Sequence, residues 1–467
     1  MVNNTQASLV LFLLCLFSLN VAFAQDDFNV WLYELKQEAL IAGISEKTAA
    51  ATINHVELLP NIIKQDRAQP EFMSTFFDYY HQRVDVVKIA RGRALLAQYE
   101  PLLSQIEAQY GVPKALLVSF WAMETNYGSY QGNIDTLSTL ATLAYDGRRA
   151  SFFRNQLLDA MRMVDAGHAG IDDFRGSWAG AFGNMQFMPS TFITYAVDGD
   201  GDERIDIVNS VPDAFASAAN YLSQVGWREG EPVMIEVQLP ENFRWQDAQL
   251  SLRKSTKEWA LQGVTVLQVS KLGSEIKAQP YSLIAKTNQS AKAAKLNTAG
   301  KRKASSKAKS KVMTKSLITN PLNLNASLKT SAPKIFVSSL PNTSSQAAIL
   351  LPQGWRGPAF MVFDNFDAMM DWNRSVNYAL SVAQLAKRIE GESPIFGGQF
   401  AETGALTFQE MFEVQATLNQ RGFDAGEPDG FPGLQTQAAV RAFQQSQYLP
   451  ADGYASPNLY SRLQATQ

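Results

Sequence analysis

Hydrophobic and polar positions follow a helical period over most of the first half of the chain. Between residues 28 and 226, apolar side chains recur at helical spacing in long segments, which Gly and Pro interrupt. Only residues 233–239 and 264–269 resemble strands well, and a further helical pattern covers residues 378–389. The pattern therefore predicts a mainly α-helical domain with a small β element.

The last part of the chain has the pattern of a separate small unit. Residues 392–405 contain Gly, Ser and Pro and are predicted to be a linker. Residues 406–465 then contain helical segments, which Asp-Gly turns join into three predicted helices. The residues expected to form its core are Phe408, Phe412, Val414, Leu418, Val440, Phe443, Leu459 and Leu463.

Composition changes sharply between these two units. Residues 277–345 are rich in Lys, Ser, Ala and Asn and are predicted to be a disordered insertion, which divides the folded domain into residues 25–276 and 346–391. The 13 Lys and Arg residues between 277 and 334 leave 28 basic and 44 acidic residues elsewhere. Because a nucleic-acid enzyme carries its basic surface on folded domains, that class is disfavoured. The insertion is either an inert loop or an electrostatic contact to an anionic polymer, a membrane surface or an acidic partner.

The first 24 residues have the features of a signal peptide. An apolar run from Leu9 to Leu19 precedes Ala22-Phe23-Ala24, the small-x-small pattern that a signal peptidase cleaves. The run is shorter than a membrane span, although an uncleaved anchor or a lipoprotein signal at Cys15 are alternatives. Cleavage would leave a protein without cysteine, which suits an oxidising compartment. The expected location is the periplasm.

Glu124 is the candidate catalytic residue. It lies near the end of a predicted helix that Pro113 begins and Gly128 follows, and this helix is apolar almost all round. Apolar surroundings and the negative end of the helix dipole both disfavour the carboxylate, so the group can stay protonated and act as a general acid. The alternative is a structural ion pair with Arg148, Arg149 or Arg175.

An acidic loop is the candidate metal site. Asp198, Asp200 and Asp202 alternate with Gly in the pattern of a calcium loop, and Arg204 would add a backbone carbonyl. Glu203 stands where such loops have Gly, and Asn209 stands where they have Glu. The sequence predicts either a structural calcium or a solvated acidic turn.

Several motifs together resemble the lytic murein transglycosylase B family. They are Glu124-Thr-Asn-Tyr-Gly128, the segment from Gly176 to Thr191, the segment from Tyr195 to Asp202, Ala218-Ala-Asn-Tyr221, Gly226-Trp227 and the segment from Asp371 to Tyr378. The resemblance covers residues 28–275 and 355–391. It implies a lysozyme-like α-helical core and carries over Glu124 as the sole acid and base. Ser177, Gln186, Tyr221, Asn373 and Tyr378 would line the sugar sites, Trp372 stands where the family has an aromatic residue, and Asp213 would close the calcium site.

The resemblance implies cleavage of the β-1,4 bond between N-acetylmuramic acid and N-acetylglucosamine in peptidoglycan, with formation of a 1,6-anhydromuramic acid end. One carboxylate suffices because the substrate's own C6 hydroxyl replaces water, so catalysis needs no cofactor. The C-terminal unit resembles a three-helix peptidoglycan-binding domain, and its alternative is a packing domain without a ligand. A monomer is expected. The alternative functions are a hydrolytic muramidase on the same core and a catalytically idle wall-binding scaffold.

Overall fold

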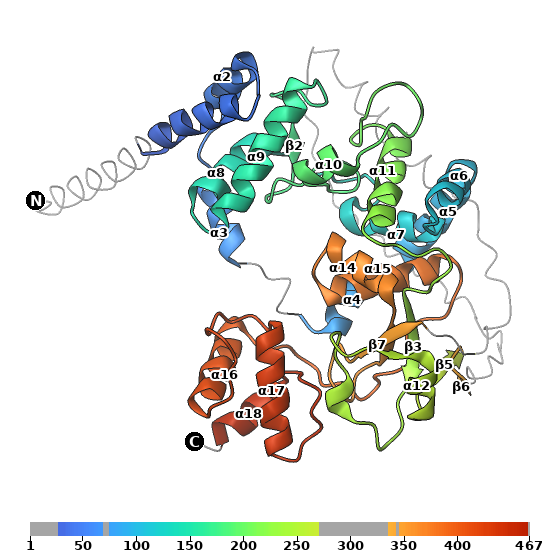
Figure 1. The fold of residues 1–467 in the computed structure, drawn as a ribbon. Helices are drawn as coiled ribbons and strands as arrows, with labels where there is room; N and C mark the ends of the chain where they lie inside the picture. The colour runs from blue at the N-terminus through green and yellow to red at the C-terminus, as the bar shows by residue number, and fades with distance from the viewer. Residues whose placement is uncertain (1–26, 69–73, 270–334, 342–344, 466–467) are drawn as a thin grey trace, which may run out of the picture. The chain divides into compact units, whose positions relative to one another are not determined.

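The structure, a computed structural model, describes residues 27–68, 74–269, 335–341 and 345–465 (Figure 1). The predicted signal peptide, residues 1–24, and most of the predicted basic insertion lie outside these residues. Within the described ranges, no helix combines the length and the apolar character that a membrane span requires.

Helices make up most of the first part of the chain, as the hydrophobic pattern predicts. Residues 27–41 are helical. The helices that follow are α2 (Glu46–His55), α3 (Pro60–Ala68), α4 (Phe76–Arg83), α5 (Val86–Gln98), α6 (Glu100–Tyr110), α7 (Lys114–Thr125), α8 (Thr136–Tyr145), α9 (Ala150–Asp165), α10 (Pro189–Tyr195) and α11 (Val211–Gln224). A two-stranded ribbon of β1 (Ile134–Asp135) and β2 (Arg175–Gly176) accompanies them.

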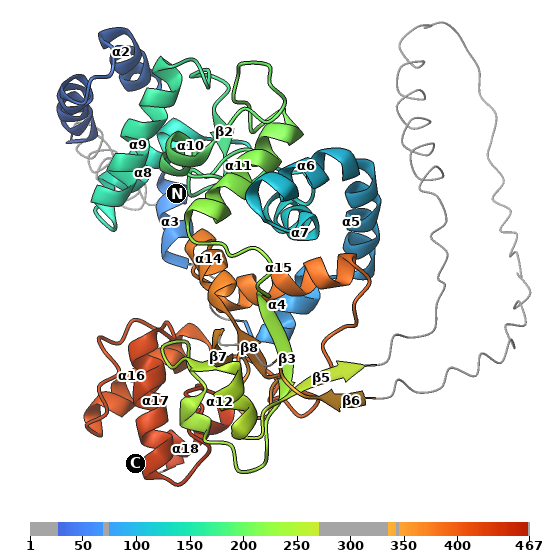
Figure 2. The ribbon, with the colours of Figure 1, turned by 45° about the vertical axis from the view of Figure 1, so that its right-hand side comes forward.

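Helix α7 is the centre of this helical part. Its residues from Ala115 to Ala122 are all buried, because apolar side chains lie on every face of the helix. Helix α15 (Val376–Ile389) packs against it (Figure 2), and the Ser119 hydroxyl donates to the Val382 carbonyl at 2.6 Å. This buried hydrogen bond fixes the two helices relative to each other. Helix α15 also confirms the helix predicted over residues 378–389.

A six-stranded sheet forms the small β element. Its order is β4-β7-β8-β3-β5-β6, and the pairs β3–β5, β3–β8, β4–β7 and β7–β8 are antiparallel. The strands are β3 (Met234–Gln238), β4 (Lys254–Ser255), β5 (Thr265–Val269), β6 (Ile335–Ser338), β7 (Gln346–Leu350) and β8 (Phe360–Val362). Strands β3 and β5 confirm the two predicted strands.

The basic insertion was predicted to extend to residue 345, but ordered structure begins before that residue. Strand β6 lies within that range, because the basic composition ends at Lys334 and the apolar residues 335–337 that follow can pair in a sheet. A turn of 3-10 helix (Trp245–Asp247) and helix α12 (Thr256–Leu261) accompany the sheet. The fully buried Trp259 of α12 donates to the Ala347 carbonyl of β7 at 2.8 Å.

The C-terminal unit consists of three helices, as predicted. They are α16 (Phe408–Gln420), α17 (Leu434–Ser446) and α18 (Pro457–Ala465). Six of the eight predicted core residues are buried, but Phe408 and Phe412 are 48% and 38% exposed. The buried face of α16 runs through Met411, Val414 and Leu418, so the two phenylalanines lie outside it.

Candidate active site

Glu124 lies in the last turn of α7, where the sequence places it. The helix ends abruptly, because Asn126 and Tyr127 both adopt left-handed backbone angles, with φ of 49° and 61°. Such conformations are unfavourable for residues other than Gly and are typical of functional sites. The turn directs the chain away from α7 directly after the carboxyl group.

Two side chains donate hydrogen bonds to one oxygen of Glu124. The indole Nε1 of Trp372 lies 2.9 Å from Oε1, and the hydroxyl of Tyr378 donates to the same atom. Trp372 is the last residue of α14 (Asp364–Trp372), and Tyr378 lies in the first turn of α15. The short break between these helices therefore presents both donors to the acid.

The hydrogen bond between α7 and α15 explains this alignment. Ser119 contacts Val382, and Glu124, just over one turn later in α7, contacts Tyr378, one turn earlier in α15. The two helices are therefore antiparallel at this point. Ser375 supports the arrangement, because its side chain caps α15 by accepting from the Tyr378 backbone N–H.

Aromatic rings enclose the Trp372 indole. Its centroid lies 4.4 Å from the ring of Phe120, 5.2 Å from Tyr221 and 5.4 Å from Phe187. Tyr221 is 9% exposed, and burial raises the pKa of its hydroxyl to about 12, so it stays protonated. The acid is thus bordered on the Trp372 side by apolar ring surface and by uncharged donors.

The arginines proposed as alternative partners of Glu124 bond elsewhere. Arg148 and Arg149 both pair with the buried carboxylate of Asp66. Arg175 donates to the backbone carbonyl of Asp172 at 3.2 Å. Glu124 instead accepts hydrogen bonds from Trp372 and Tyr378, which agrees with a catalytic acid better than with an ion pair to one of these arginines.

Ser177 and Gln186 lie on one tight loop, but neither has a hydrogen bond to Glu124 among the contacts described. The backbone of Ser177 pairs with Ala181, and the Ser177 hydroxyl accepts from the Ala181 N–H at 3.2 Å. Gln186, with φ of 49°, donates its side-chain amide to the carbonyls of Gln131 and Gly183. This leaves the Ser177 O–H and the Gln186 carbonyl as the polar groups these side chains can offer a ligand.

Close backbone packing holds this loop in place. A Cβ atom on Gly132 would lie 2.1 Å from the Gly176 carbonyl oxygen, so this approach requires glycine. The loop reaches the acid through Phe187, whose ring packs against Trp372.

Asn373 caps the C-terminus of α14 directly after Trp372. The side-chain oxygen Oδ1 of Asn373 accepts from the Ser375 backbone N–H at 3.1 Å. The side-chain amide N–H groups are therefore what it can donate to a sugar. Three of the predicted sugar-site residues therefore lie at the Trp372–Glu124 pair. Tyr221 packs on Trp372, Asn373 follows Trp372 in the chain, and Tyr378 donates to Glu124.

Asn184 is a structural residue of the site that the sequence analysis did not single out. Its side-chain carbonyl accepts from the Trp121 indole at 2.9 Å, and its amide donates to the carbonyls of Ile207 and Val208. Its backbone carbonyl accepts from the Thr125 hydroxyl at 2.8 Å, next to Glu124. The position of Asn184 inside the Gly-Asn-Met-Gln motif was the available signal, but nothing in the sequence separates a buried node from a sugar ligand.

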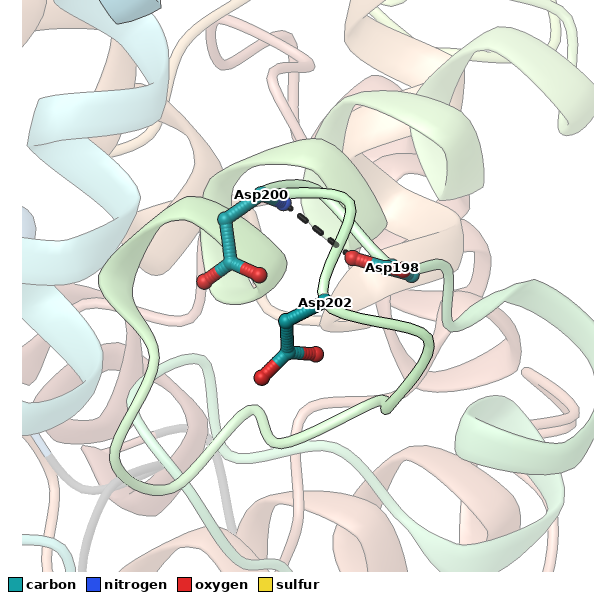
Figure 3. A group of neighbouring side chains, drawn as sticks. All are labelled: Asp198, Asp200 and Asp202. Atoms are coloured by element: carbon teal, nitrogen blue, oxygen red, sulfur yellow. Dashed lines mark hydrogen bonds between the residues drawn. The ribbon is translucent and has the colours of Figure 1, made fainter.

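The acidic loop brings three of the predicted metal ligands together. Figure 3 shows Asp198, Asp200 and Asp202, whose carboxylates each offer an oxygen within 4.8 Å of the others. Asp198 also accepts from the backbone N–H groups of Gly201 and Glu203 at 2.6 and 2.8 Å. Burial works against the charge of Asp198, but these hydrogen bonds outweigh it and hold its pKa below the usual range.

Asp213 is placed differently from the three clustered carboxylates. It is buried, and its two oxygens accept from the backbone N–H groups of Gly199 and Asp206 at 2.8 and 2.7 Å. It therefore closes the loop through backbone hydrogen bonds. Arg204, whose carbonyl was the other predicted ligand, donates its N–H to Asp202 at 2.9 Å. Glu203 adopts φ of 67° at the position where calcium loops have Gly.

The site is thus one acid that accepts hydrogen bonds from two donors in a helical core. Comparison with known proteins identifies the family to which this fold belongs. The model of the transglycosylase SLT domain matches residues 27–301 and 300–387, and a peptidoglycan binding domain model matches residues 409–463. The chain belongs to the transglycosylase SLT domain family.

One curated relative matches part of the chain. The chain is 35% identical over 162 residues to membrane-bound lytic murein transglycosylase B of Escherichia coli, a match that covers 33% of this chain and 45% of that protein. The chain thus spans less than half the length of this curated relative.

Solved structures match over a greater length. SltB3 from Pseudomonas aeruginosa, solved in complex with NAG-anhNAM-pentapeptide and with NAG-NAM-pentapeptide, is 35% identical with a TM-score of 0.75. In the first complex the match covers 94% of this chain and 99% of that one. Slt35 of Escherichia coli, solved in complex with calcium, shares the fold at 22% identity and a TM-score of 0.54, over 77% of this chain and 92% of that one. The mainly α-helical, lysozyme-like fold and the C-terminal binding domain predicted from the sequence are confirmed.

Proposed function

We propose that this protein is a lytic murein transglycosylase. It cleaves the β-1,4 bond between N-acetylmuramic acid and N-acetylglucosamine in peptidoglycan and leaves a 1,6-anhydromuramic acid end. The observation that carries the proposal is Glu124, which Trp372 and Tyr378 hold by hydrogen bonds. The fold around it is shared over nearly the whole chain with SltB3, which was solved in complex with NAG-anhNAM-pentapeptide and with NAG-NAM-pentapeptide.

Glu124 performs both proton transfers. As an acid it protonates the glycosidic oxygen while the bond from C1 breaks and its electron pair passes to that oxygen. The C6 hydroxyl of the same sugar then attacks C1 and gives its proton to the carboxylate, which regenerates the acid. No water is consumed and no second carboxylate is required, unlike in ordinary glycosidases.

Uncharged polar groups suit the rest of this site. Ser177, Gln186 and Asn373 supply hydroxyl and amide groups that can bind N-acetyl substituents without adding charge.

Incubation of purified sacculi with the protein tests this function. The wild type should release soluble muropeptides, and Glu124→Gln should bind sacculi without releasing them. Glu241→Gln is the matched control, because it makes the same change at an exposed glutamate that is not one of the predicted site residues. A wild type that binds but releases nothing would favour the idle scaffold.

The acidic loop is proposed to bind a structural calcium. Asp198, Asp200 and Asp202 fit such an ion, because hard oxygen ligands are what calcium prefers and their clustered charges would otherwise repel one another. Arg204 and Asp213 were predicted to complete the site; in this structure Asp213 instead supports the loop backbone. The ion would stabilise the loop and takes no part in the reaction.

The remaining regions are proposed to hold the enzyme at its substrate. The C-terminal helices α16–α18 would bind the wall and raise the local substrate concentration, and the location would be the periplasm. The basic segment 277–345 would add an electrostatic contact to anionic polymer, and the enzyme would act as a monomer. Deletion of residues 286–330, which leaves strand β6 in place, should weaken sacculus binding at low salt more than at high salt. Unchanged affinity at both salt concentrations would make the segment an inert insertion.

A further inference from the structure

The indole of Trp372 makes a contact that the mechanism above does not use. Its Nε1–H points to Oε1 of Glu124 at 2.9 Å, and the Tyr378 hydroxyl donates to the same oxygen. An indole N–H can donate a hydrogen bond but cannot accept one. Oε1 therefore acts as an acceptor toward Trp372 in both protonation states of the carboxyl group.

The surroundings of Trp372 prevent the indole from turning away. Phe120 packs on it from α7, Phe187 from the loop that carries Gln186, and Tyr221 from α11, with centroids between 4.4 and 5.4 Å apart. Phe120 precedes Glu124 by one helical turn, so the acid and the packing of its donor come from the same helix. The direction of the N–H group is thus set by three separate parts of the chain.

We propose that Trp372 is a positioning residue that assigns different tasks to the two oxygens of Glu124. Oε1 is the fixed acceptor, and Oε2 carries the proton that goes to the glycosidic oxygen and that the C6 hydroxyl later returns. A proton on Oε1 would add a third hydrogen to an atom that already receives two. This inference rests on the proposed function and states how one carboxyl group serves as acid and then as base.

The two donors also stabilise the charged form of Glu124. Hydrogen bonds to a carboxylate favour its ionisation, whereas apolar surroundings disfavour ionisation. Removing the N–H should therefore keep Glu124 protonated to higher pH and move the alkaline limb of the activity profile upward. It should also lower kcat, because the carboxyl group can rotate and Oε2 is no longer aimed at the glycosidic oxygen.

Replacement of Trp372 by benzothienylalanine tests the inference, because sulfur replaces the N–H in a ring of nearly the same shape. On soluble uncrosslinked glycan strands, kcat should fall about tenfold and the alkaline limb should move up by about one pH unit. Trp372→Phe should move the limb in the same direction. Phe152→Leu, on an exposed ring outside the site, should leave the limb where it is.

Two results would overturn the inference. One is a benzothienylalanine variant with the pH profile and kcat of the wild type, and the other is an equal shift in Phe152→Leu. Failure of the proposed function is a separate outcome, because the wild type itself would then yield no anhydro product.

Discussion

Two groups of carboxylates in this molecule have opposite surroundings. Glu124 is a single acid at the end of a buried helix, with two uncharged donors on one oxygen, and three aromatic rings pack on one of these donors, Trp372. Asp198, Asp200 and Asp202 lie together on a largely exposed loop, where backbone N–H groups bind Asp198. The first setting holds a proton for transfer, and the second collects negative charge for a cation. The side-chain chemistry is the same, so the backbone and the neighbouring rings decide the role.

The largest expected effect is the loss of activity in Glu124→Gln, which distinguishes the catalytic acid from the acidic loop. Glu124→Gln should reduce turnover of sacculi by about 10³-fold or more, because the amide cannot donate or recover the proton. Asp200→Ala should leave most of the activity intact, because the proposed ion takes no part in the reaction. Rates of muropeptide release from both variants provide the measurement. Comparable losses in the two variants would contradict the division of roles.

Asn184 connects the two regions, and its replacement should destabilise the protein most. Asn184→Ala leaves the Trp121 N–H without its partner and removes one of the two hydrogen bonds that each of the Ile207 and Val208 carbonyls accepts, at a cost of about 3 kcal/mol in unfolding free energy. Urea denaturation measures this cost. Asn209→Ala, on an exposed side chain that bonds Asp206, is the matched control. An equally small effect of both changes would show that Asn184 is not a structural node.

The response to calcium tests the acidic loop. Removal of divalent ions should lower the melting temperature, and calcium should restore it, because an ion at 100 times its Kd adds about 2.7 kcal/mol to the folded state. Asp200→Ala should abolish this response. If the melting curve with chelator matches the curve with calcium, the loop is a solvated acidic turn.

The smallest expected effect concerns Glu236, a half-buried carboxylate outside both regions. Burial raises the pKa of Glu236, although the N–H groups of Gly397 and Phe396 bind the carboxylate and act in the opposite direction. Because the folded state holds this proton above the ordinary value of 4.5, the stability it contributes is lost as pH rises through the raised value.

Glu236→Gln removes this titration. The wild type should therefore gain stability relative to the variant as pH falls from neutral toward 4.5, as unfolding free energies at several pH values can show. Glu241→Gln, on an exposed side chain, should show no such trend. A difference between wild type and Glu236→Gln that does not depend on pH would mean that burial leaves the pKa of Glu236 unshifted.

Much of the fold followed from local sequence signals. The all-round apolar pattern of α7 predicted its burial, and Pro113 and Gly128 bracketed it, because such end signals act within a few residues. The extent of the sheet was less predictable. Strand β7 and the short strands β4, β6 and β8 gain their stability from partners distant in the sequence, which a local pattern does not contain.

The site was predictable in its residue types but not in its contacts. The motifs identified Glu124 and Tyr378, yet the sequence assigned Tyr378 to the sugar rather than to the acid. That Tyr378 and Trp372 share Oε1 depends on the break between α14 and α15 and on the Ser119–Val382 hydrogen bond across 263 residues. Such a contact is a property of helix packing and not of any one segment.

The fate of solvent oxygen tests the central claim most directly. Sacculi digested in water labelled with heavy oxygen should give anhydro products without label, since the C6 hydroxyl of the substrate attacks C1 and no water is consumed. Mass spectrometry of the released disaccharide peptides provides the measurement. Products heavier by one water that carry the label at the reducing end would show a hydrolytic muramidase and contradict the account.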